Sequence, residues 1–215
     1  MSQKSLFLAG EGDAWFARNK VVTAEQQCRW EEQDALLQLL QQLPLPKDET
    51  VKAVEVGCGQ GLRMSALQRC YGWQVFGIDP SAEAVASARG MNVDAQVGTA
   101  DHLPFEDSSV DCLVYGFCLY LCDPADLFHI AAEAHRVLKP KSWLLILDFW
   151  SPSFHGNAYH HLDGVMSYKA DRASMFSWHP SYIVTDQSVR HHGTNEYTDD
   201  SHEWVSTTVL RRHDA

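Results

Sequence analysis

Residues 54–61 read Val-Glu-Val-Gly-Cys-Gly-Gln-Gly, a short apolar run that ends in three alternating glycines. Further apolar residues lead into it from Val51, which is typical of a buried strand. A helical pattern follows from Leu62 to about Cys70. A strand, a glycine turn and a helix in this order present backbone amides and the positive end of a helix dipole to a ligand. The motif therefore predicts a ligand site at the turn, although glycines alone are a weak signal.

The spacing of the glycines distinguishes between classes of nucleotide site. Gly57, Gly59 and Gly61 form the pattern GxGxG, whereas the dinucleotide fingerprint GxGxxG requires glycine at the position of Leu62. This spacing argues against a nicotinamide-dependent oxidoreductase, which remains the least favoured of the alternatives.

Two acidic residues follow the glycine turn at the ends of further predicted strands. Residues 74–78 read as a second strand that ends at Asp79, at the spacing of about 20 residues where a carboxylate accepts ribose hydroxyls. Asp101 comes just past a third short strand, 95–97, where it could accept a hydrogen bond from an adenine amino group. Aspartate also commonly begins turns, so either residue alone is ambiguous. Three strand-end signals in register favour a nucleoside-binding site.

The ordered set of motifs resembles the class I methyltransferases that use S-adenosylmethionine. The resemblance covers roughly residues 50–149, with one departure, Lys141-Ser142 in place of a Gly-Gly turn. The motifs that carry it are Glu55-Val56-Gly57-Cys58-Gly59-Gln60-Gly61, Gly77-Ile78-Asp79-Pro80-Ser81, Ala100-Asp101-His102-Leu103-Pro104-Phe105, Phe105-Glu106-Asp107-Ser108-Ser109-Val110-Asp111 and Glu133-Ala134-His135-Arg136-Val137-Leu138-Lys139-Pro140.

This resemblance implies S-adenosylmethionine as the cofactor and S-adenosylhomocysteine as the product. We expect Arg18 to meet the methionine carboxylate as a bidentate pair. The full set of expected cofactor-binding residues is Arg18, Glu55, Gly57, Cys58, Gly59, Gly61, Asp79, Pro80, Asp101, His102, Leu103 and Tyr115.

Strand and helix patterns alternate through the middle of the chain, which predicts an α/β fold with a parallel sheet between helices. The strands are expected near 52–56, 74–78, 94–97, 110–116 and 143–149. Two later β-like runs, 182–189 and 204–210, fit the antiparallel pair that completes the sheet in the resembled family. The prediction is a doubly wound, Rossmann-like, seven-stranded and mostly parallel sheet with one antiparallel strand and an N-terminal helical cap.

We predict a single methyltransferase domain over residues 1–215, in three zones. Residues 1–49 form an N-terminal cap or lid, with one helix of about 20 residues from Thr23 to Gln42. Residues 50–149 form the cofactor-binding core, and 150–215 form an acceptor-side segment and a C-terminal hairpin. Trp15 and Phe16 either close over the cofactor or only anchor the cap.

Composition limits the partners and the compartment. The formal net charge of −11 disfavours non-specific binding to nucleic acid or anionic membranes. No signal peptide or long apolar segment is apparent, so we expect a cytoplasmic protein with no membrane partner. The six cysteines form no CxxC pair, and the histidine pairs lack a typical ligand spacing, so no metal site is expected. The oligomeric state stays open.

Candidate catalytic residues follow the fifth predicted strand. His155, Tyr159 and His160 lie where an acceptor should enter, and a hydroxyl acceptor needs a general base, for which histidine is suited. A phosphate or carboxylate acceptor would need no base, and these residues could equally be surface residues of a loop. The wider set of expected acceptor-pocket residues adds Tyr115, Phe117, Tyr168, Lys169 and Trp178.

The acceptor is expected to be a small polar metabolite. Residues 7–19, 167–176 and 203–208 are similar to small methylases associated with bacterial surface-sugar biosynthesis, including the pseudaminic-acid-associated methylases. That similarity implies O-methylation of a sugar or of a sugar-linked phosphorus group. The main alternative is a methyltransferase-fold binding protein without turnover, which S-adenosylhomocysteine production would distinguish.

Overall fold

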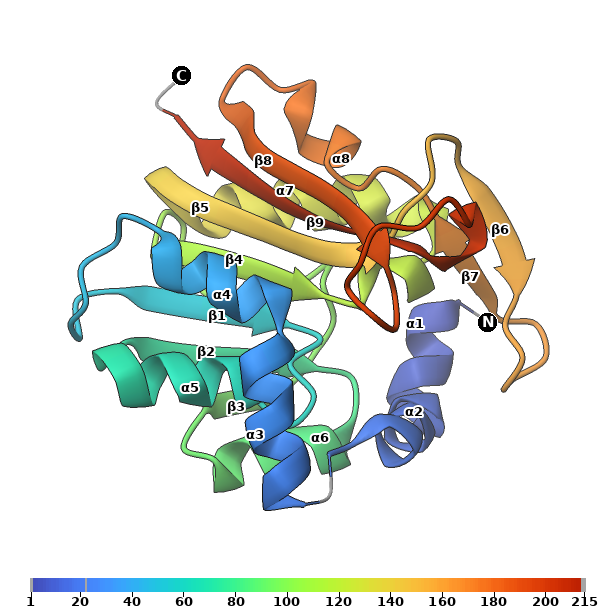
Figure 1. The fold of residues 1–215 in the computed structure, drawn as a ribbon, viewed down its shortest axis with the longest axis horizontal. Coiled ribbons are helices and arrows are strands. Elements are labelled where there is room, and N and C mark those ends of the chain that lie inside the picture. The colour runs from blue at the N-terminus through green and yellow to red at the C-terminus, as the bar shows by residue number, and fades with distance from the viewer. Residues whose placement is uncertain (1, 22, 214–215) are drawn as a thin grey trace.

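A computed structural model describes residues 2–21 and 23–213, and its centre is a seven-stranded sheet (Figure 1). The strand order is β3-β2-β1-β4-β5-β9-β8. The strands are β1 (Lys52–Val56), β2 (Gln74–Asp79), β3 (Asp94–Val97), β4 (Val110–Gly116), β5 (Leu138–Phe149), β8 (Tyr182–His191) and β9 (Trp204–Arg212).

The pairing confirms the predicted sheet. Strands β3, β2, β1, β4 and β5 pair in parallel, and β9 is antiparallel to both β5 and β8. The expected C-terminal pair is therefore present, with each strand longer than its pattern. Because the parallel strands share a direction, the ends of β1, β2 and β4 meet at one edge of the sheet, where ligands of such folds bind.

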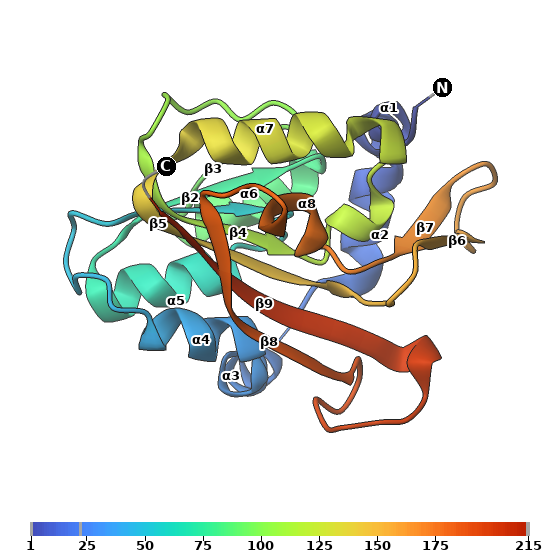
Figure 2. The ribbon, with the colours of Figure 1, turned by 90° about the horizontal axis from the view of Figure 1, so that it is seen from above.

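Helices cover both faces of the sheet, as Figure 2 shows for α7 on one side and α4 and α5 on the other. Leu36, Leu40 and Leu67 pack with one set of inward strand side chains, and Ile130 and Phe176 pack with the opposite set. The helices are α4 (Ala35–Gln42), α5 (Leu62–Tyr71), α6 (Ala82–Gly90), α7 (Leu127–Val137) and α8 (Ser174–Ser177), with 3₁₀ turns η2 (Leu119–Leu121), η3 (Pro124–Asp126) and η4 (Ser201–Glu203).

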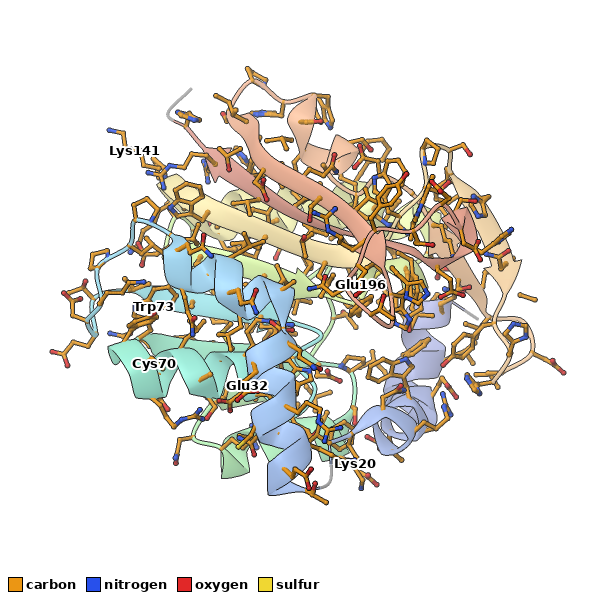
Figure 3. The ribbon with its side chains drawn as sticks, in the orientation of Figure 1. Lys20, Glu32, Cys70, Trp73, Lys141 and Glu196 are labelled. Carbon is orange, nitrogen blue, oxygen red and sulfur yellow. The ribbon has the colours of Figure 1, made fainter. Side chains whose placement is uncertain are left out.

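Strand β5 begins at Leu138, before the predicted apolar run 143–149, and it contains a turn at Lys141. Lys141 has φ 60°, the left-handed conformation that glycine usually supplies, so Lys141-Ser142 performs the turn expected of Gly-Gly. Figure 3 shows Lys141 pointing outward, at the end of the molecule opposite to α1 (Gln3–Leu6) and α2 (Gly12–Asn19).

The predicted continuous helix from Thr23 to Gln42 is wrong, because the chain breaks at Asp34. Helix α3 (Ala24–Gln33) ends there and α4 begins, with Asp34 extended at φ −70° and ψ 108°. In this conformation the Asp34 carboxylate accepts a hydrogen bond from the Leu37 amide at 2.6 Å and so caps α4. It also accepts two bonds from Arg63, at 3.0 and 2.7 Å. The break thus lets one carboxylate serve both a helix end and an ion pair.

Arg63 links the Asp34 carboxylate, which caps α4, to the sheet. Its guanidinium pairs with Asp34 and with Glu55 of β1, and Arg63 and Glu55 are only 6% and 2% exposed. A buried charge left without a partner is strongly destabilising, so removing one member should cost far more than breaking a surface pair.

The short N-terminal helices are tied to distant segments. Gln3, 4% exposed, donates from its backbone to Asp123 and from its side chain to the Leu121 carbonyl, both at 2.8 Å. Its side-chain oxygen accepts from Met166 of β7 (Met166–Lys169), which pairs with β6 (His155–Ala158). A π-helical turn, Phe7–Glu11, follows and kinks at Gly10, whose φ is 145°. The N-terminal segment is therefore held over the carboxyl ends of the strands.

We predict that Asp34→Ala lowers the free energy of unfolding by about 3–5 kcal/mol, because it leaves Arg63 buried with one fewer partner and uncaps α4. Urea denaturation followed by circular dichroism measures the change. Arg29→Ala is the control, since it removes an exposed i,i+4 pair with Glu25 and should cost less than about 0.5 kcal/mol. Equal effects of the two changes would contradict this account.

Candidate functional site

The carboxyl ends of β1 and β2 are joined by backbone hydrogen bonds. The amides of Gly57 and Cys58 donate to the Ile78 carbonyl at 2.8 and 3.2 Å. The next amide, Gly59, donates to the Asp79 carboxylate at 2.9 Å, and the Ser81 amide donates to its other oxygen at 2.9 Å. Burial raises the pKa of Asp79, while these amides oppose the rise. The strand-end carboxylate is thus held in one orientation beside the glycine turn.

The three glycines of the turn all have positive φ, but for different reasons. At Gly57 a Cβ would lie 2.7 Å from the Cβ of Cys118, so close packing excludes a side chain. At Gly61 a Cβ would approach Val93 and Ala88, where α5 begins. At Gly59 a Cβ would meet nothing within 4 Å, so the protein itself leaves that position open.

Two cavities flank the turn. The first holds about 790 Å³ of space including its open mouth, and the second about 670 Å³. Trp15, Gly57 and Phe117 line both cavities, so the two meet at the end of β1.

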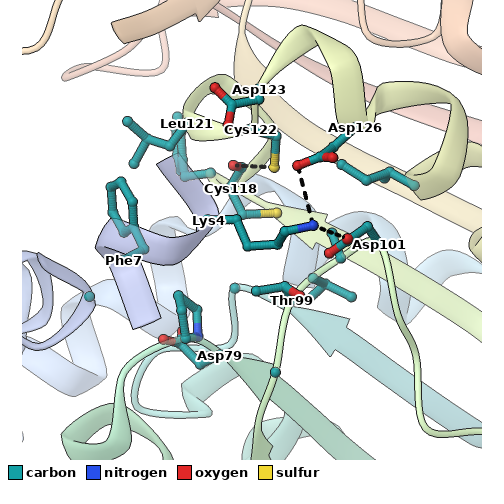
Figure 4. A pocket seen from close by; sticks show the side chains of 18 of the residues that line it. Lys4, Phe7, Asp79, Thr99, Asp101, Cys118, Leu121, Cys122, Asp123 and Asp126 are labelled. Atoms are coloured by element: carbon teal, nitrogen blue, oxygen red, sulfur yellow. Dashed lines mark hydrogen bonds and ion pairs between the residues drawn. The ribbon is translucent and has the colours of Figure 1, made fainter. Parts of the chain in front are cut away.

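Lys4 lies on the wall of the first cavity, between two carboxylates (Figure 4). Its ammonium pairs with the Asp101 carboxylate and lies 3.6 Å from Asp126. Although burial acts to raise it, the hydrogen bond from Lys4 lowers the pKa of Asp101 below its ordinary value. Asp101 therefore faces the cavity as expected, but a cation already neutralises it. Sequence reasoning missed Lys4, since the two residues are 97 positions apart and no periodicity links them.

Glu55 and Arg63 lie on the wall of the second cavity. Burial raises the pKa of Glu55 to about 7, against the opposing effect of the Arg63 guanidinium. One carboxylate oxygen of Glu55 has no hydrogen-bond partner among the residues that the structure describes. That oxygen is itself buried.

The expected cofactor-binding residues fall into two groups. Seven line a cavity: Glu55, Gly57, Cys58, Gly59, Asp79, Pro80 and Asp101. The other five do not, namely Arg18, Gly61, His102, Leu103 and Tyr115. Tyr115 and Leu103 are buried in the core, and His102 is exposed. Alternation within β4 explains Tyr115, because its side chain points into the sheet's packed face while the cavity meets the next residues, Gly116 and Phe117.

Arg18 contacts protein groups instead of a cavity. Its guanidinium donates to Glu11 at 2.5 Å and to the Tyr159 hydroxyl at 2.9 Å, and that hydroxyl donates to Glu11 at 3.0 Å. Burial raises the pKa of Tyr159 to about 12. This triad fastens α2 to the segment after β6.

The two expected histidine bases lie away from the cavities. His155 and His160 are exposed at β6 and just after it, and neither lines a cavity. The His155 ring contacts the Ser153 carbonyl at 3.2 Å. Their catalytic role stays a prediction. Of the wider set of expected acceptor residues, Phe117 lies on the wall of both of these cavities.

Within the described residues, no three or more His, Cys, Asp or Glu side chains are grouped so that they could hold a metal ion. The helices that the structure describes include none of the length and apolarity needed to span a bilayer.

Comparison with known proteins agrees with this geometry. A family model described as "Methyltransferase domain" matches residues 54–146. The chain is 40% identical over 104 residues to a ubiquinone/menaquinone biosynthesis C-methyltransferase of Rubrivivax gelatinosus, covering 47% of this chain and 40% of that protein. It is 29% identical over 147 residues to a demethylmenaquinone methyltransferase of Geobacillus kaustophilus, covering 64% and 59%. The chain thus spans about half the length of these curated relatives.

Solved structures share the fold over more of the chain. A putative methyltransferase solved in complex with the Haloferax volcanii Trm112 activator superimposes with a TM-score of 0.65, at 22% identity, over 95% of this chain and 98% of that one. The [4+2]-cyclase SpnF superimposes with a TM-score of 0.67, at 18% identity, over 100% and 97%.

The fold, the motif set and the matched domain agree. Residues 54–146 match a methyltransferase domain, and the chain around them has the fold of a solved methyltransferase.

The raised pKa of Glu55 predicts a pH dependence of stability. A glutamate in the unfolded chain has a pKa of about 4.3, whereas burial raises the pKa of Glu55 to about 7 in the folded protein. Between these values the unfolded state binds fewer protons, so the free energy of unfolding should fall as the pH rises. Glu55→Gln should reduce the fall between pH 5 and pH 7.5 by roughly 1–3 kcal/mol, as measured by urea unfolding.

The exposed Glu25→Gln serves as the control for this prediction and should keep the wild-type dependence. An unchanged pH profile in Glu55→Gln would show that Glu55 stays ionised through the pairing with Arg63.

Proposed function

We propose that this protein transfers a methyl group from S-adenosylmethionine to a small-molecule acceptor. The observation that carries the proposal is the meeting of two cavities at Gly57, beside a carboxylate, Asp79, held by two backbone amides. The ribose hydroxyls would bond to Asp79, which can accept from both at once. The adenine would lie in the first cavity near Asp101, and the methionyl ammonium and carboxylate in the second, near Glu55 and Gly59.

The charges of the second cavity suit an amino acid group. Glu55, on the cavity wall, would face the ammonium, and the backbone amides at the start of α5 would donate to the carboxylate. Arg18 is not needed in this arrangement, and its expected contact with the methionine carboxylate would require it to leave Glu11 and Tyr159.

Catalysis in such a site is mostly alignment. The methyl carbon of a sulfonium is already a strong electrophile, so the nucleophile, the carbon and the sulfur must be nearly collinear. Holding two reactants in this geometry can supply about 7–11 kcal/mol of the barrier. Trp15, which lines both cavities and is held through its indole N–H to the Tyr120 hydroxyl at 3.0 Å, supports a role for α2 in closing the site.

We interpret residues 1–49 as the lid, 50–149 as the cofactor-binding core and 150–215 as the acceptor side of one domain. In this interpretation Lys4 must share Asp101 with the adenine, or release it, when the cofactor enters. The net charge of −11 supports a small molecule over a nucleic acid as the acceptor.

The acceptor itself stays a proposal. The two curated relatives are named for quinone biosynthesis, one of them as a C-methyltransferase, and they give no support to O-methylation of a sugar or of a sugar-linked phosphorus group. Cofactor binding without methyl transfer is the second candidate, because SpnF carries this fold along its whole length and is named a cyclase, so the fold alone does not fix the reaction.

Calorimetry with S-adenosylhomocysteine tests the cofactor site. We expect micromolar binding to the wild type, and Asp79→Ala should weaken it by about 10-fold to 150-fold through loss of charged hydrogen bonds worth roughly 1.5–3 kcal/mol. Asp94→Ala, at the exposed start of β3, should bind like the wild type. No heat from the wild type at millimolar ligand would refute the proposal. S-adenosylhomocysteine formation from S-adenosylmethionine in a small-molecule extract separates turnover from binding.

Gly59→Val tests whether the glycine turn faces the cofactor. The protein leaves open space at Gly59, so the variant should fold but lose cofactor binding, because the new side chain would occupy ligand space. Gly164→Val is the matched control, with a positive φ of 83° and equally open space in the β6–β7 loop. Each change should cost about 1–3 kcal/mol in backbone strain, measured by thermal unfolding. Only Gly59→Val should lose affinity for S-adenosylhomocysteine, and full affinity would place the ligand elsewhere.

A further inference from the structure

One side chain joins the glycine turn to the segment between α2 and α3, called here the α2–α3 link. The Val21 amide donates to Oε1 of Gln60 at 2.5 Å, and Nε2 of Gln60 donates to the Val21 carbonyl at 2.9 Å. Gln60 stands between Gly59 and Gly61, so it belongs to the turn itself. The paired contact engages both backbone groups of one residue, and it therefore holds this part of the link against the start of α5.

This contact places Lys20, the residue before Val21, on the wall of the second cavity. Lys20 lines that cavity together with Gly59 and Gln60. Its ammonium lies 5.8 Å from the ring centre of Phe16, which lines the same cavity. Figure 3 labels Lys20 at the link between α2 and α3. The ammonium is thus positioned beside the space that the proposed methionyl group would fill.

Lys20 brings a positive charge to this cavity that no protein group neutralises. Lys20 and Arg63 are the cationic side chains on its wall, and Arg63 is already engaged by two buried carboxylates. Within residues 2–21 and 23–213, no carboxylate forms an ion pair with the Lys20 ammonium. Arg18 is held in its triad and lines neither cavity. An anionic group that enters the second cavity would therefore find its free cation at Lys20.

The first turn of α5 adds backbone donors to the same cavity. Amides in the first turn of a helix have no partner within the helix. Gly61 is the N-cap residue of α5, and it has no side chain that could accept from these amides. Leu62, the first residue of α5, lines the second cavity. A carboxylate is a ligand group that suits a cation and free amides at a helix start together.

Resting on the proposed function, we propose that the α2–α3 link recognises the carboxylate of the cofactor, with Lys20 as the cation that contacts it. Gln60 is the positioning residue, because it holds the link in place through Val21. In this arrangement the carboxylate binds both the Lys20 ammonium and the first-turn amides of α5. The role expected of Arg18 thus belongs to Lys20. A nucleoside thioether without the carboxylate gains nothing from Lys20, so the link selects ligands that carry the complete amino acid group.

Calorimetry with two ligands that differ only in the carboxylate tests the role of Lys20. The ligands are S-adenosylhomocysteine and its decarboxylated analogue, which keeps the adenosine, the thioether and the ammonium. Lys20→Met should weaken S-adenosylhomocysteine binding by about 5-fold to 30-fold, between the effects of an exposed ion pair and of a buried charged hydrogen bond. The analogue should bind equally well or more tightly, since the change removes a cation that repels its ammonium.

Two further variants serve as controls for this measurement. Lys20→Arg keeps the charge and should bind S-adenosylhomocysteine within about 3-fold of the wild type. Lys47→Met removes an exposed lysine that lines neither cavity, and it should bind both ligands like the wild type. Thermal unfolding checks that each variant is folded.

A double-mutant cycle tests the positioning role of Gln60. Gln60→Ala should weaken S-adenosylhomocysteine binding by about 3-fold to 10-fold and leave the affinity for the analogue unchanged. In the Gln60→Ala background, Lys20→Met should cause a smaller loss than in the wild type, because the link no longer holds the ammonium in place. A merely structural role of Gln60 would weaken both ligands equally and leave the two losses additive.

The outcomes distinguish this proposal from the proposed function. If the wild type binds neither ligand, the proposed function fails. If S-adenosylhomocysteine binds and Lys20→Met affects both ligands equally or neither of them, cofactor binding stands and the recognition role of Lys20 is overturned. Additive losses in the double variant would overturn the positioning role of Gln60.

Discussion

The buried ion network of Glu55, Arg63 and Asp34 is the constraint on which the rest of the site depends. It joins β1, the first turn of α5 and the break between α3 and α4. It also leaves no room for a side chain at Gly116, the last residue of β4, since a Cβ there would lie 2.9 Å from both Arg63 and Glu55. Two carboxylates share one guanidinium, and burial leaves one Glu55 oxygen unpartnered on the cavity wall. The network therefore holds β1 and α5, the two elements that the glycine turn connects, in a fixed relation.

The region beyond β4 shows how packing supports a strained backbone. Gly57 has no space for a side chain because Cys118 lies against it, and Phe117, between Gly116 and Cys118, takes a left-handed conformation. Its ring is held by aromatic neighbours from β5 and from the loop after β8. Such neighbours offset the local strain and fix the wall between the cavities.

The N-terminal segment lies over the carboxyl ends of the strands. Gln3 ties it to η2, η3 and β7, Lys4 neutralises Asp101, and Trp15 bonds to Tyr120. The Arg18–Glu11–Tyr159 triad fastens its far end to the segment after β6.

The sequence by itself determined the sheet, the glycine turn and the carboxylates Asp79 and Asp101, because these depend on local periodicity and on strand ends. Local pattern also sufficed for the C-terminal pair of strands. It failed at Asp34, where an ion pair with Arg63 outweighs helix propensity, and it missed Lys4. Only the tertiary structure decided those contacts, as well as the burial of Tyr115 and the exposure of His155 and His160. Their partners lie far along the chain, and what brings them together is the packing of whole elements, which no spacing in the sequence encodes.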